Sequence, residues 1–374
     1  MKPEQPLRRG WTTGACATAA AKSAFTALVA GEFLDPVEIT LPRGLSASFA
    51  LALSRRDGDA ATAGIVKDAG DDPDVTHGAL IRATVRLGAP GSGVVFRAGP
   101  GVGMVTRPGL PIPPGEPAIN PAPRRMIRTA IEEVATRHSC GADVEVEIAV
   151  EGGDELAKRT VNPRLGIVGG VSILGTTGIV VPYSCSAWIH SIHRGIDVAR
   201  AAGLDHVAGS TGNTSEIAVQ KLHGLPEVAL LDMGDFVGGM LKYLRRHPVP
   251  RVTVAGGIAK MTKLAQGRLD LHSRRGSVDL GALAELAQAA GASPGVAAQI
   301  ARSNTALEAF QHAAAAGIAL GDAVAAAAWG TAAAALDDAE IALEIVVFDR
   351  DGALVGRAPF HPVHGATPPR NRRL

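Results

Sequence analysis

Hydrophobic residues in the first 150 positions alternate with polar ones in short runs, whereas those beyond residue 200 form continuous apolar runs. Short alternating runs indicate half-buried strands. The predicted strands of this part are 37–41, 46–53, 62–66, 80–87, 94–96 and 144–150. Residues 8–31 predict a polar loop followed by an alanine-rich helix that ends at Gly31, and a second helix is predicted over 124–137. Because strands follow one another with few helices between them, we expect an α+β domain with a largely antiparallel sheet over 1–152.

The later part of the chain has the rhythm of a parallel sheet. Apolar runs at 206–210, 228–231 and 252–255 predict buried strands, separated by helices near 215–223 and 236–246. Alanine-rich helices over 280–336 and a hairpin turning at Asp351-Gly352 follow. We therefore expect a three-layer α/β domain with a mostly parallel sheet, a Rossmann-like variant, over 153–374.

Composition excludes several classes of protein. With 374 residues, 46% of them hydrophobic, and a net charge of +1, the chain can bury a large core. A near-neutral charge and 3% aromatic residues argue against nucleic-acid binding. Alanine-rich runs near the N-terminus and at 313–336 are interrupted by charged residues, so no membrane segment is expected. Three dispersed cysteines form no C-x-x-C pair, which fits a reducing cytoplasm.

A stretch dense in glycine, residues 164–182, is the first candidate for a ligand site. Gly169 and Gly170 follow a short apolar run and let the backbone turn and approach a ligand closely. Gly175-Thr176-Thr177-Gly178 offers N–H groups and hydroxyls to a carboxylate, a phosphate or a nucleotide edge. The spacing matches neither the dinucleotide fingerprint nor a P-loop. Alternatively, these glycines serve only tight turns.

The predicted parallel sheet offers a second part of that candidate site. Ligands bind such sheets at the carboxyl ends of their strands. The carboxyl end of the strand predicted at 206–210 carries the run from Gly209 to Asn213, so we expect both of these residues to line one crevice with the glycine-dense stretch.

The segment 67–78 contains four aspartates, Lys67 and His77. Hard-metal binding is disfavoured because the calcium-loop register and its closing glutamate are absent. Clustered carboxylates can raise one another's pKa and exchange a proton, which makes Asp68, Asp71 and Asp72 candidates for acid/base chemistry. A solvated acidic turn capped by aspartates is the alternative.

Two further segments carry polar residues in positions suited to a ligand. Thr12 and Thr13 lie at the start of the helix within 8–31, where they either bind an anion or simply cap the helix. Residues 99–124 form a long loop rich in proline and glycine, and such loops inside compact domains are usually functional. Its polar residues are Arg107, Glu116, Asn120 and Arg124, although Asn120 and the prolines beside it also suit a helix start.

Four blocks together resemble one family. They are Trp11–Cys16, Lys67–Asp74, Gly115–Asn120 and Asn162–Gly178. In this order they resemble the cobalt-precorrin-5B C1-methyltransferases of cobalamin biosynthesis, the CbiD type, over nearly the whole chain. One departure is Gly256-Gly257, where many relatives carry a histidine, so no histidine role is inferred there.

The resemblance implies transfer of a methyl group from S-adenosylmethionine to ring carbon C1 of cobalt-precorrin-5B, giving cobalt-precorrin-6A. The cobalt would belong to the substrate, and no protein-bound metal is expected. Cofactor contacts are expected from Gly169, Gly170, Gly175, Thr176, Thr177, Gly178, Gly209 and Asn213. Tetrapyrrole contacts are expected from Thr12, Thr13, Lys67, His77, Arg107, Glu116, Asn120 and Arg124, with Asp68, Asp71 and Asp72 as the catalytic candidates.

Other functions compete with this one. The chain could be a non-catalytic carrier of corrinoid intermediates or, more remotely, a nicotinamide-dependent oxidoreductase. Cofactor binding discriminates between them. We expect no nucleic-acid or membrane partner, leave a homo-oligomer open, and expect the two domains to supply different parts of one active site.

Overall fold

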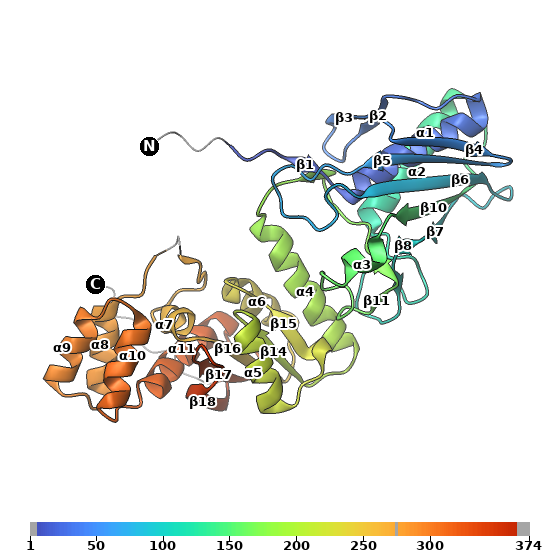
Figure 1. The fold of residues 1–374 in the computed structure, drawn as a ribbon. Coiled ribbons are helices and arrows are strands. Elements are labelled where there is room, and N and C mark those ends of the chain that lie inside the picture. Colours follow the sequence, from blue (N-terminus) through green and yellow to red (C-terminus); the bar gives the residue numbers. More distant parts are fainter. Residues whose placement is uncertain (1–5, 274–275, 365–374) are drawn as a thin grey trace. The chain divides into compact units, whose positions relative to one another are not determined.

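The computed structural model describes residues 6–273 and 276–364. The chain forms two compact units, Met1–Ser184 and Cys185–Leu374, and each combines helices with sheet (Figure 1). The prediction of a mixed α/β protein is therefore confirmed. The domain boundary expected after residue 152 differs from this division, because strands between residues 167 and 180 pair with strands of the first unit.

A five-stranded sheet forms the centre of the first unit, in the order β4-β5-β6-β10-β7. Its strands are β4 Leu53–Asp57, β5 Ala60–Val66, β6 Leu80–Leu87, β10 Val144–Val150 and β7 Val94–Ala98. Neighbouring strands run antiparallel except β10 and β7, which are parallel. In β6, Ile81, Ala83 and Val85 are buried on one face, as the alternating pattern predicts.

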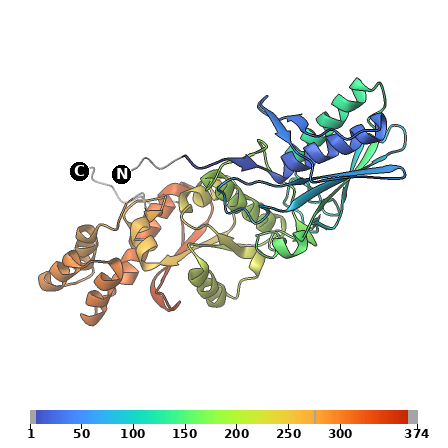
Figure 2. The same ribbon diagram turned by 45° about the horizontal axis from the view of Figure 1, so that its top comes forward.

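Helices α1 (Thr13–Ala30) and α2 (Pro121–Arg137) lie side by side on one face of this sheet, as both views show (Figures 1 and 2). Most of α1 is buried, and its alanines permit close packing against β5, β6 and α2. Lys22 of α1 forms a 2.7 Å ion pair with Glu133 of α2. The helix ends at Gly31 in the left-handed conformation, as predicted.

Short strand pairs complete the first unit. β1 (Gly10–Trp11) pairs with β13 (Ile179–Val180), β11 (Ile167–Val168) with β9 (Met104–Val105), and β12 (Gly170–Val171) with β8 (Gly101–Val102). A β2–β3 hairpin (Val37–Thr40, Ser46–Phe49) and α3 (Gly153–Ala157) are also present. The apolar run at 165–168 therefore contributes a two-residue strand to an antiparallel pair and does not begin the parallel sheet.

The second unit has a five-stranded sheet in the order β15-β14-β16-β17-β18. Its strands are β15 Leu230–Asp232, β14 His206–Ser210, β16 Arg251–Gly257, β17 Ala342–Phe348 and β18 Leu354–Pro362. The first four are parallel, and β18 returns antiparallel to β17. A short 3₁₀ turn, Glu227–Ala229, occupies the start of the strand expected at 228–231, which shortens β15.

Both faces of this second sheet are covered by helices. α5 (Asn213–His223) covers one face, and α4 (Cys185–Ala201), α6 (Val237–Leu244), α7 (Ile258–Ala265) and α11 (Leu320–Leu336) lie on the other. α8 (Leu280–Ala289), α9 (Pro294–Arg302) and α10 (Ala306–Ala315) pack beyond them (Figure 1). None of the described helices is both long and apolar enough to cross a membrane.

A buried polar network joins five elements of the second unit, β14, α5, β16, β17 and β18. The fully buried Glu344 on β17 accepts hydrogen bonds from Thr253 (2.8 Å) and Arg357 (2.8 Å), and its other contact is His223 Nε2 at 2.6 Å. His206 Nε2 lies 2.8 Å from the Thr253 hydroxyl. Because that hydroxyl donates to Glu344, it accepts from His206, whose Nε2 therefore carries a proton.

Burial, reinforced by the charge of His223, lowers the pKa of His206 to about 4. An unfolded histidine titrates near ~6.5, so His206 is neutral in the fold and its contribution to stability is complete above that pH. That contribution is lost as the pH falls towards 4. We expect the free energy of unfolding to drop by about 3 kcal/mol from this residue alone.

Urea titrations between pH 7 and pH 4 test this expectation. His206→Gln should give a shallower loss of stability than wild type over that range, because the titrating group is gone. His138→Gln, at an exposed histidine, is the matched control and should follow wild type. Equal slopes for His206→Gln and wild type would contradict the assignment.

Candidate functional site

Residues 8–14 of the first unit lie between two of the segments singled out from the sequence. The Trp11 N–H donates to the Asp68 carbonyl at 2.7 Å, and the Thr12 N–H donates to the Gly178 carbonyl at 3.0 Å. The acidic segment and the glycine-dense stretch therefore flank the start of α1. The glycine-dense stretch groups with the first unit, whereas the sequence led us to assign it to the second.

The loop that leads to α2 adjoins the same region. The Ile173 N–H donates to the Ala118 carbonyl at 2.8 Å, and the Asn120 N–H donates to the Ile173 carbonyl at 2.9 Å. The side chain of Asn120 makes no capping hydrogen bond to α2 and is half-exposed. All four resemblance blocks thus meet in the first unit through backbone hydrogen bonds.

Thr12 and Thr13 are both engaged within the protein. The Thr12 hydroxyl accepts the Ala15 N–H at 3.2 Å and caps α1. The Thr13 hydroxyl donates to the Leu174 carbonyl at 3.2 Å and accepts the Leu174 N–H at 3.1 Å. Since both threonines are buried, the capping interpretation explains them, and the structure gives no support to direct ligand contact.

Asp68 and Asp71 hold Arg8. Both Asp68 carboxylate oxygens receive the Arg8 guanidinium, one of them at 2.9 Å, and Asp71 Oδ2 accepts the Arg8 N–H at 2.6 Å. The Arg8 hydrogen bond, followed by one from the Gly70 N–H, lowers the pKa of Asp68 to about 2. A carboxylate with so low a pKa is a poor proton acceptor near neutral pH, so the expected catalytic role of Asp68 finds no support.

The remaining carboxylates of this segment also have structural partners. Asp72 Oδ1 accepts the Tyr183 N–H at 2.8 Å. Asp74 is paired with the buried Lys67, whose ammonium also donates to the Thr76 hydroxyl at 2.6 Å. Lys67 is buried, so the structure gives no support to its expected contact with substrate. The alternative of a turn capped by aspartates describes this segment better.

His77 is also exposed in this segment. Its Nδ1 accepts the Ala69 N–H at 3.1 Å, which places the ring proton of the neutral form on Nε2. Asp68 Oδ1 lies 3.9 Å from Nδ1. His77 can therefore offer an outward N–H donor to a ligand carboxylate, as its predicted substrate role requires.

Most glycines of the dense stretch are needed for packing within the protein. A Cβ added at Gly170 would lie 2.2 Å from the Gly101 carbonyl oxygen. At Gly175 it would lie 2.4 Å from Thr12, and at Gly178 it would lie 2.5 Å from Leu41. Close approach of chain to chain, and not of chain to ligand, explains these three positions.

Two residues of the stretch, Gly169 and Thr176, remain open to a ligand, whereas Thr177 is engaged within the chain. Gly169 has φ 90° and nothing within 4 Å of an added Cβ. Thr176 is exposed. The Thr177 hydroxyl makes a local turn, accepting the Ile179 N–H at 3.3 Å and donating to the Ile179 carbonyl at 3.2 Å.

The long loop before α2 is pinned by an ion pair. Arg124 Nη2 donates to Glu116 at 3.0 Å, Arg124 Nε donates to the Ile119 carbonyl at 2.8 Å, and the guanidinium lies 5.2 Å from the centroid of the Phe96 ring. Glu116 and Arg124 thus shape the loop. Arg107 is exposed and retains a guanidinium available for a carboxylate.

Gly209 and Asn213 lie in the second unit, at the carboxyl end of β14. Gly209 faces Met240, whose sulfur would lie 2.3 Å from an added Cβ, so this glycine is required by packing. Asn213 is exposed at the first turn of α5, which has no side-chain N-cap. The adjacent Ser210 is buried, and its hydroxyl has no hydrogen-bond partner among the described residues.

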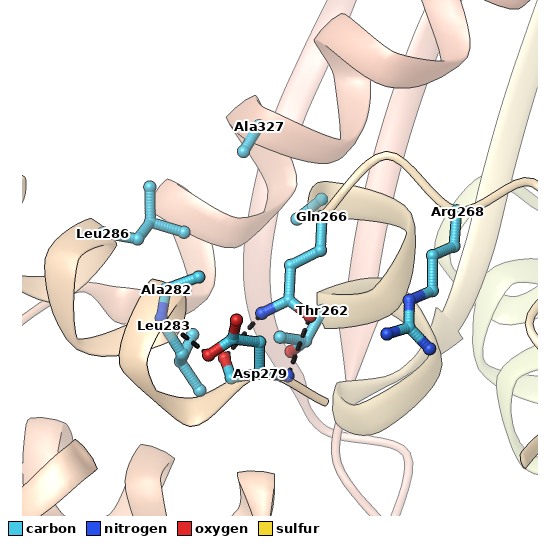
Figure 3. A pocket seen from close by; sticks show the side chains of 9 residues that line it. Thr262, Gln266, Arg268, Asp279, Ala282, Leu283, Leu286 and Ala327 are labelled. Atoms are coloured by element: carbon cyan, nitrogen blue, oxygen red, sulfur yellow. Dashed lines mark hydrogen bonds between the residues drawn. The ribbon is translucent and has the colours of Figure 1, made fainter. Parts of the chain in front are cut away.

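A cavity of about 330 Å³ lies among α7, α8 and α11 of the second unit (Figure 3). In its wall, the side-chain amide of Gln266 is hydrogen-bonded to the backbone of Asp279. Gln266 Nε2 donates to the Asp279 carbonyl (2.7 Å), and Gln266 Oε1 accepts the Asp279 N–H (3.0 Å). The described lining includes none of the predicted site residues. Nor, within the described residues, do three His, Cys, Asp or Glu side chains gather closely enough to hold a metal ion.

Three residues of interest were not predicted as site residues. Arg8 gave no signal, because its partner Asp68 is 60 positions away. Ser210 lies within a predicted strand, and the hydrophobic pattern of the sequence does not reveal that its hydroxyl is buried. Tyr183 is one of two tyrosines in the chain; its position between a proline and the start of α4 is the one sequence signal that it carries.

Comparison with known proteins assigns the family. The CbiD model matches residues 1–182, and the model of the CbiD C-terminal domain matches residues 270–359. A protein of Bradyrhizobium sp. (strain BTAi1 / ATCC BAA-1182) is 64% identical over 99% of this chain and 98% of its own length. The chain belongs to the CbiD family.

Named CbiD-family relatives share nearly the full length of this chain. The Bradyrhizobium protein is named cobalt-precorrin-5B C(1)-methyltransferase. So is a protein of Agrobacterium fabrum (strain C58 / ATCC 33970), 63% identical over 98% of each chain. A crystal structure of the cobalamin biosynthesis protein CbiD from Archaeoglobus fulgidus is 27% identical, with a TM-score of 0.39 over 67% of this chain and 77% of that chain.

The neighbouring glycines Gly169 and Gly170 provide a matched test of packing in the CbiD-family first unit. Gly170→Ala should destabilise it by about 3 kcal/mol, because the new methyl group meets the Gly101 backbone. Gly169→Ala should cost only about 1 kcal/mol, from its positive φ. Chemical denaturation of the two variants measures the difference in their free energies of unfolding. Equal losses of stability would show that the close contact of Gly170 with Gly101 does not exclude a methyl group.

The Arg8–Asp68 pair is tested by a double-mutant cycle. Arg8→Gln and Asp68→Asn should each speed hydrogen exchange at the Trp11 amide, because either change releases residues 8–11. The double variant should exchange no faster than either single one, since both act on one contact. Additive effects would mean that the two side chains hold this segment independently.

Proposed function

We propose that this CbiD-family protein methylates ring carbon C1 of cobalt-precorrin-5B, using S-adenosylmethionine and giving cobalt-precorrin-6A in cobalamin biosynthesis. The observation that carries the proposal is similarity over nearly the full length to relatives named for this reaction. The gathering of all four resemblance blocks in the first unit supports it. The free thiols Cys16, Cys140 and Cys185 suit a reducing cytoplasm as its location.

The first unit offers a surface suited to the tetrapyrrole. Leu174 and Val181, each 49% exposed, and Tyr183, 67% exposed, follow one another along the glycine-dense stretch beside residues 8–14. Exposed apolar side chains suit the face of a macrocycle, and patches of them usually mark binding sites. The nearby His77 and, from the loop before α2, Arg107 and Asn120 supply donors for peripheral carboxylates.

The second unit offers the better-supported cofactor site. Its parallel strands in the order β15-β14-β16-β17 support a Rossmann-like arrangement, in which ligands bind at the carboxyl ends of central strands. At the end of β14, the Ser210 hydroxyl has no hydrogen-bond partner among the described residues, α5 begins without a side-chain cap, and Asn213 is exposed in its first turn. A buried hydroxyl without a partner is costly, and a ligand acceptor or donor would remove that cost. In the glycine-dense stretch, Gly169 and Thr176 remain as secondary candidates.

The chain's residues act mainly by binding and positioning in this proposal. The cofactor supplies an electrophilic methyl group on sulfur; its C–S bond breaks as a C–C bond forms with the electron pair of ring carbon C1. Apolar side chains exclude water from the ring, and cationic or N–H donors fix its carboxylates, so that the reacting carbon is held in line. Asp68, Asp71 and Asp72 contribute by fixing the segments that form this surface.

Turnover by the full-length protein tests the function. Purified protein, cobalt-precorrin-5B and S-adenosylmethionine with a ¹³C-labelled methyl group should yield a tetrapyrrole heavier by one labelled methyl, with its carbon resonance assigned to C1. Tight tetrapyrrole binding without turnover would favour the carrier alternative. Binding of NAD in place of S-adenosylmethionine would favour the oxidoreductase.

Ser210→Ala tests the cofactor site specifically. Because the hydroxyl has no partner within the described protein, its removal should leave the free energy of unfolding unchanged or raise it by about 1 kcal/mol. Affinity for S-adenosylmethionine, measured by calorimetry, should fall by about tenfold through loss of one buried hydrogen bond. Thr214→Ala, which removes an exposed hydroxyl from the first turn of α5, is the control. Unchanged affinity in Ser210→Ala would place the cofactor elsewhere.

A further inference from the structure

Tyr183 occupies a backbone conformation that tyrosine rarely adopts. Its φ is 54°, in the left-handed region, and among the described non-glycine residues only Ser139 and Asp337 share a positive φ. Bulky side chains are disfavoured there, and glycine or asparagine would adopt the same geometry more easily. Strained residues of this kind persist where surrounding structure holds them, and they concentrate at functional sites.

The acidic segment holds Tyr183 in place. Asp72 Oδ1 accepts the Tyr183 N–H at 2.8 Å, across 111 positions of sequence. Asp72 itself lies next to Asp71, which is bound to the Arg8 backbone. The conformation of Tyr183 is therefore tied to the same network that anchors residues 8–11, and Asp72 has a specific structural task.

The side chain of Tyr183 has no hydrogen bond or ring contact among the described residues that would explain its presence. It is 67% exposed, the highest exposure among the large apolar or aromatic residues of the described chain. Within the described residues, its hydroxyl makes no hydrogen bond and its ring makes no aromatic contact. A linker ahead of α4 needs only the backbone geometry, so the phenol ring requires a different explanation.

We propose that Tyr183 contacts the tetrapyrrole, with its ring against the conjugated macrocycle, and that Asp72 is the positioning residue that aims it. This inference rests on the proposed function and deepens it by naming a specificity-determining residue for the ring. A rigid aromatic side chain provides a large contact area with few torsions to order, and it stacks on flat conjugated ligands. Its hydroxyl provides a donor for a peripheral carboxylate.

Substitutions that keep the backbone geometry but change the ring separate contact from linker function. Tyr183→Gly and Tyr183→Asn accept the positive φ, so their thermal midpoints should equal or exceed that of wild type. Their KM for the tetrapyrrole should rise about tenfold, because aromatic contacts dominate such sites. Tyr183→Phe should stay within about threefold of wild type, since the ring remains. The KM for S-adenosylmethionine should not change in any of the three.

Ser139→Gly is the matched control. It relaxes the same kind of positive φ at an exposed position after α2, and it should leave both KM values unchanged. Asp72→Ala should raise the tetrapyrrole KM in the wild-type background but add nothing in the Tyr183→Gly background, because Asp72 acts through the ring.

The possible outcomes separate a failure of the role of Tyr183 from a failure of the proposed methyltransferase function. Active wild type together with a Tyr183→Gly variant of unchanged tetrapyrrole KM would overturn the role of Tyr183 and leave the methyltransferase proposal standing. Additive effects of Asp72→Ala and Tyr183→Gly would overturn the positioning role. Wild type that neither binds nor methylates the tetrapyrrole would overturn the proposed function and this inference with it.

Discussion

Backbone contact around residues 8–14 is the constraint on which the first unit depends. The segment donates N–H groups to the acidic segment on one side and to the glycine-dense stretch on the other. A Cβ at Gly10 would lie 2.0 Å from the Ala69 carbonyl carbon, and one at Gly70 would lie 2.2 Å from the Arg8 carbonyl oxygen. Such close approach leaves room only for glycine, and it brings together three segments that are distant in sequence.

Secondary structure was largely predictable, because an element that is buried on one face has hydrophobic residues at regular intervals along its sequence. Strand β6 and helix α1 with its Gly31 end follow the predicted bounds closely. The run predicted as one strand at 46–53 instead divides into β3 and β4. β4 lies at a sheet edge with exposed side chains, so it lacks the apolar alternation by which a strand is recognised.

The candidate site was predictable only in part, because its long-range partners leave no local pattern. The segments that meet around residues 8–14 stand out in the sequence, yet the partners of several of their residues could not be read from it. Lys67 resembles a solvated cation but is buried beside Asp74, and Asp68 resembles a base but is paired with Arg8. A high density of glycines likewise indicates that something approaches the backbone closely. It does not tell whether that neighbour is a ligand or another part of the chain.

The pairing of β1 with β13 has a consequence for the order in which the protein is made. It joins the first strand of the unit to its last, and α1 begins against Leu174 and Gly178. On the ribosome, α1 emerges long before these residues. Its alanine-rich surface therefore stays without its packing partners until most of the unit has been synthesised. Domains fold as units during translation, and contacts between distant residues form slowly. The growing chain therefore remains incompletely folded for a long time, and we expect chaperones to bind its exposed apolar surface mainly at this stage.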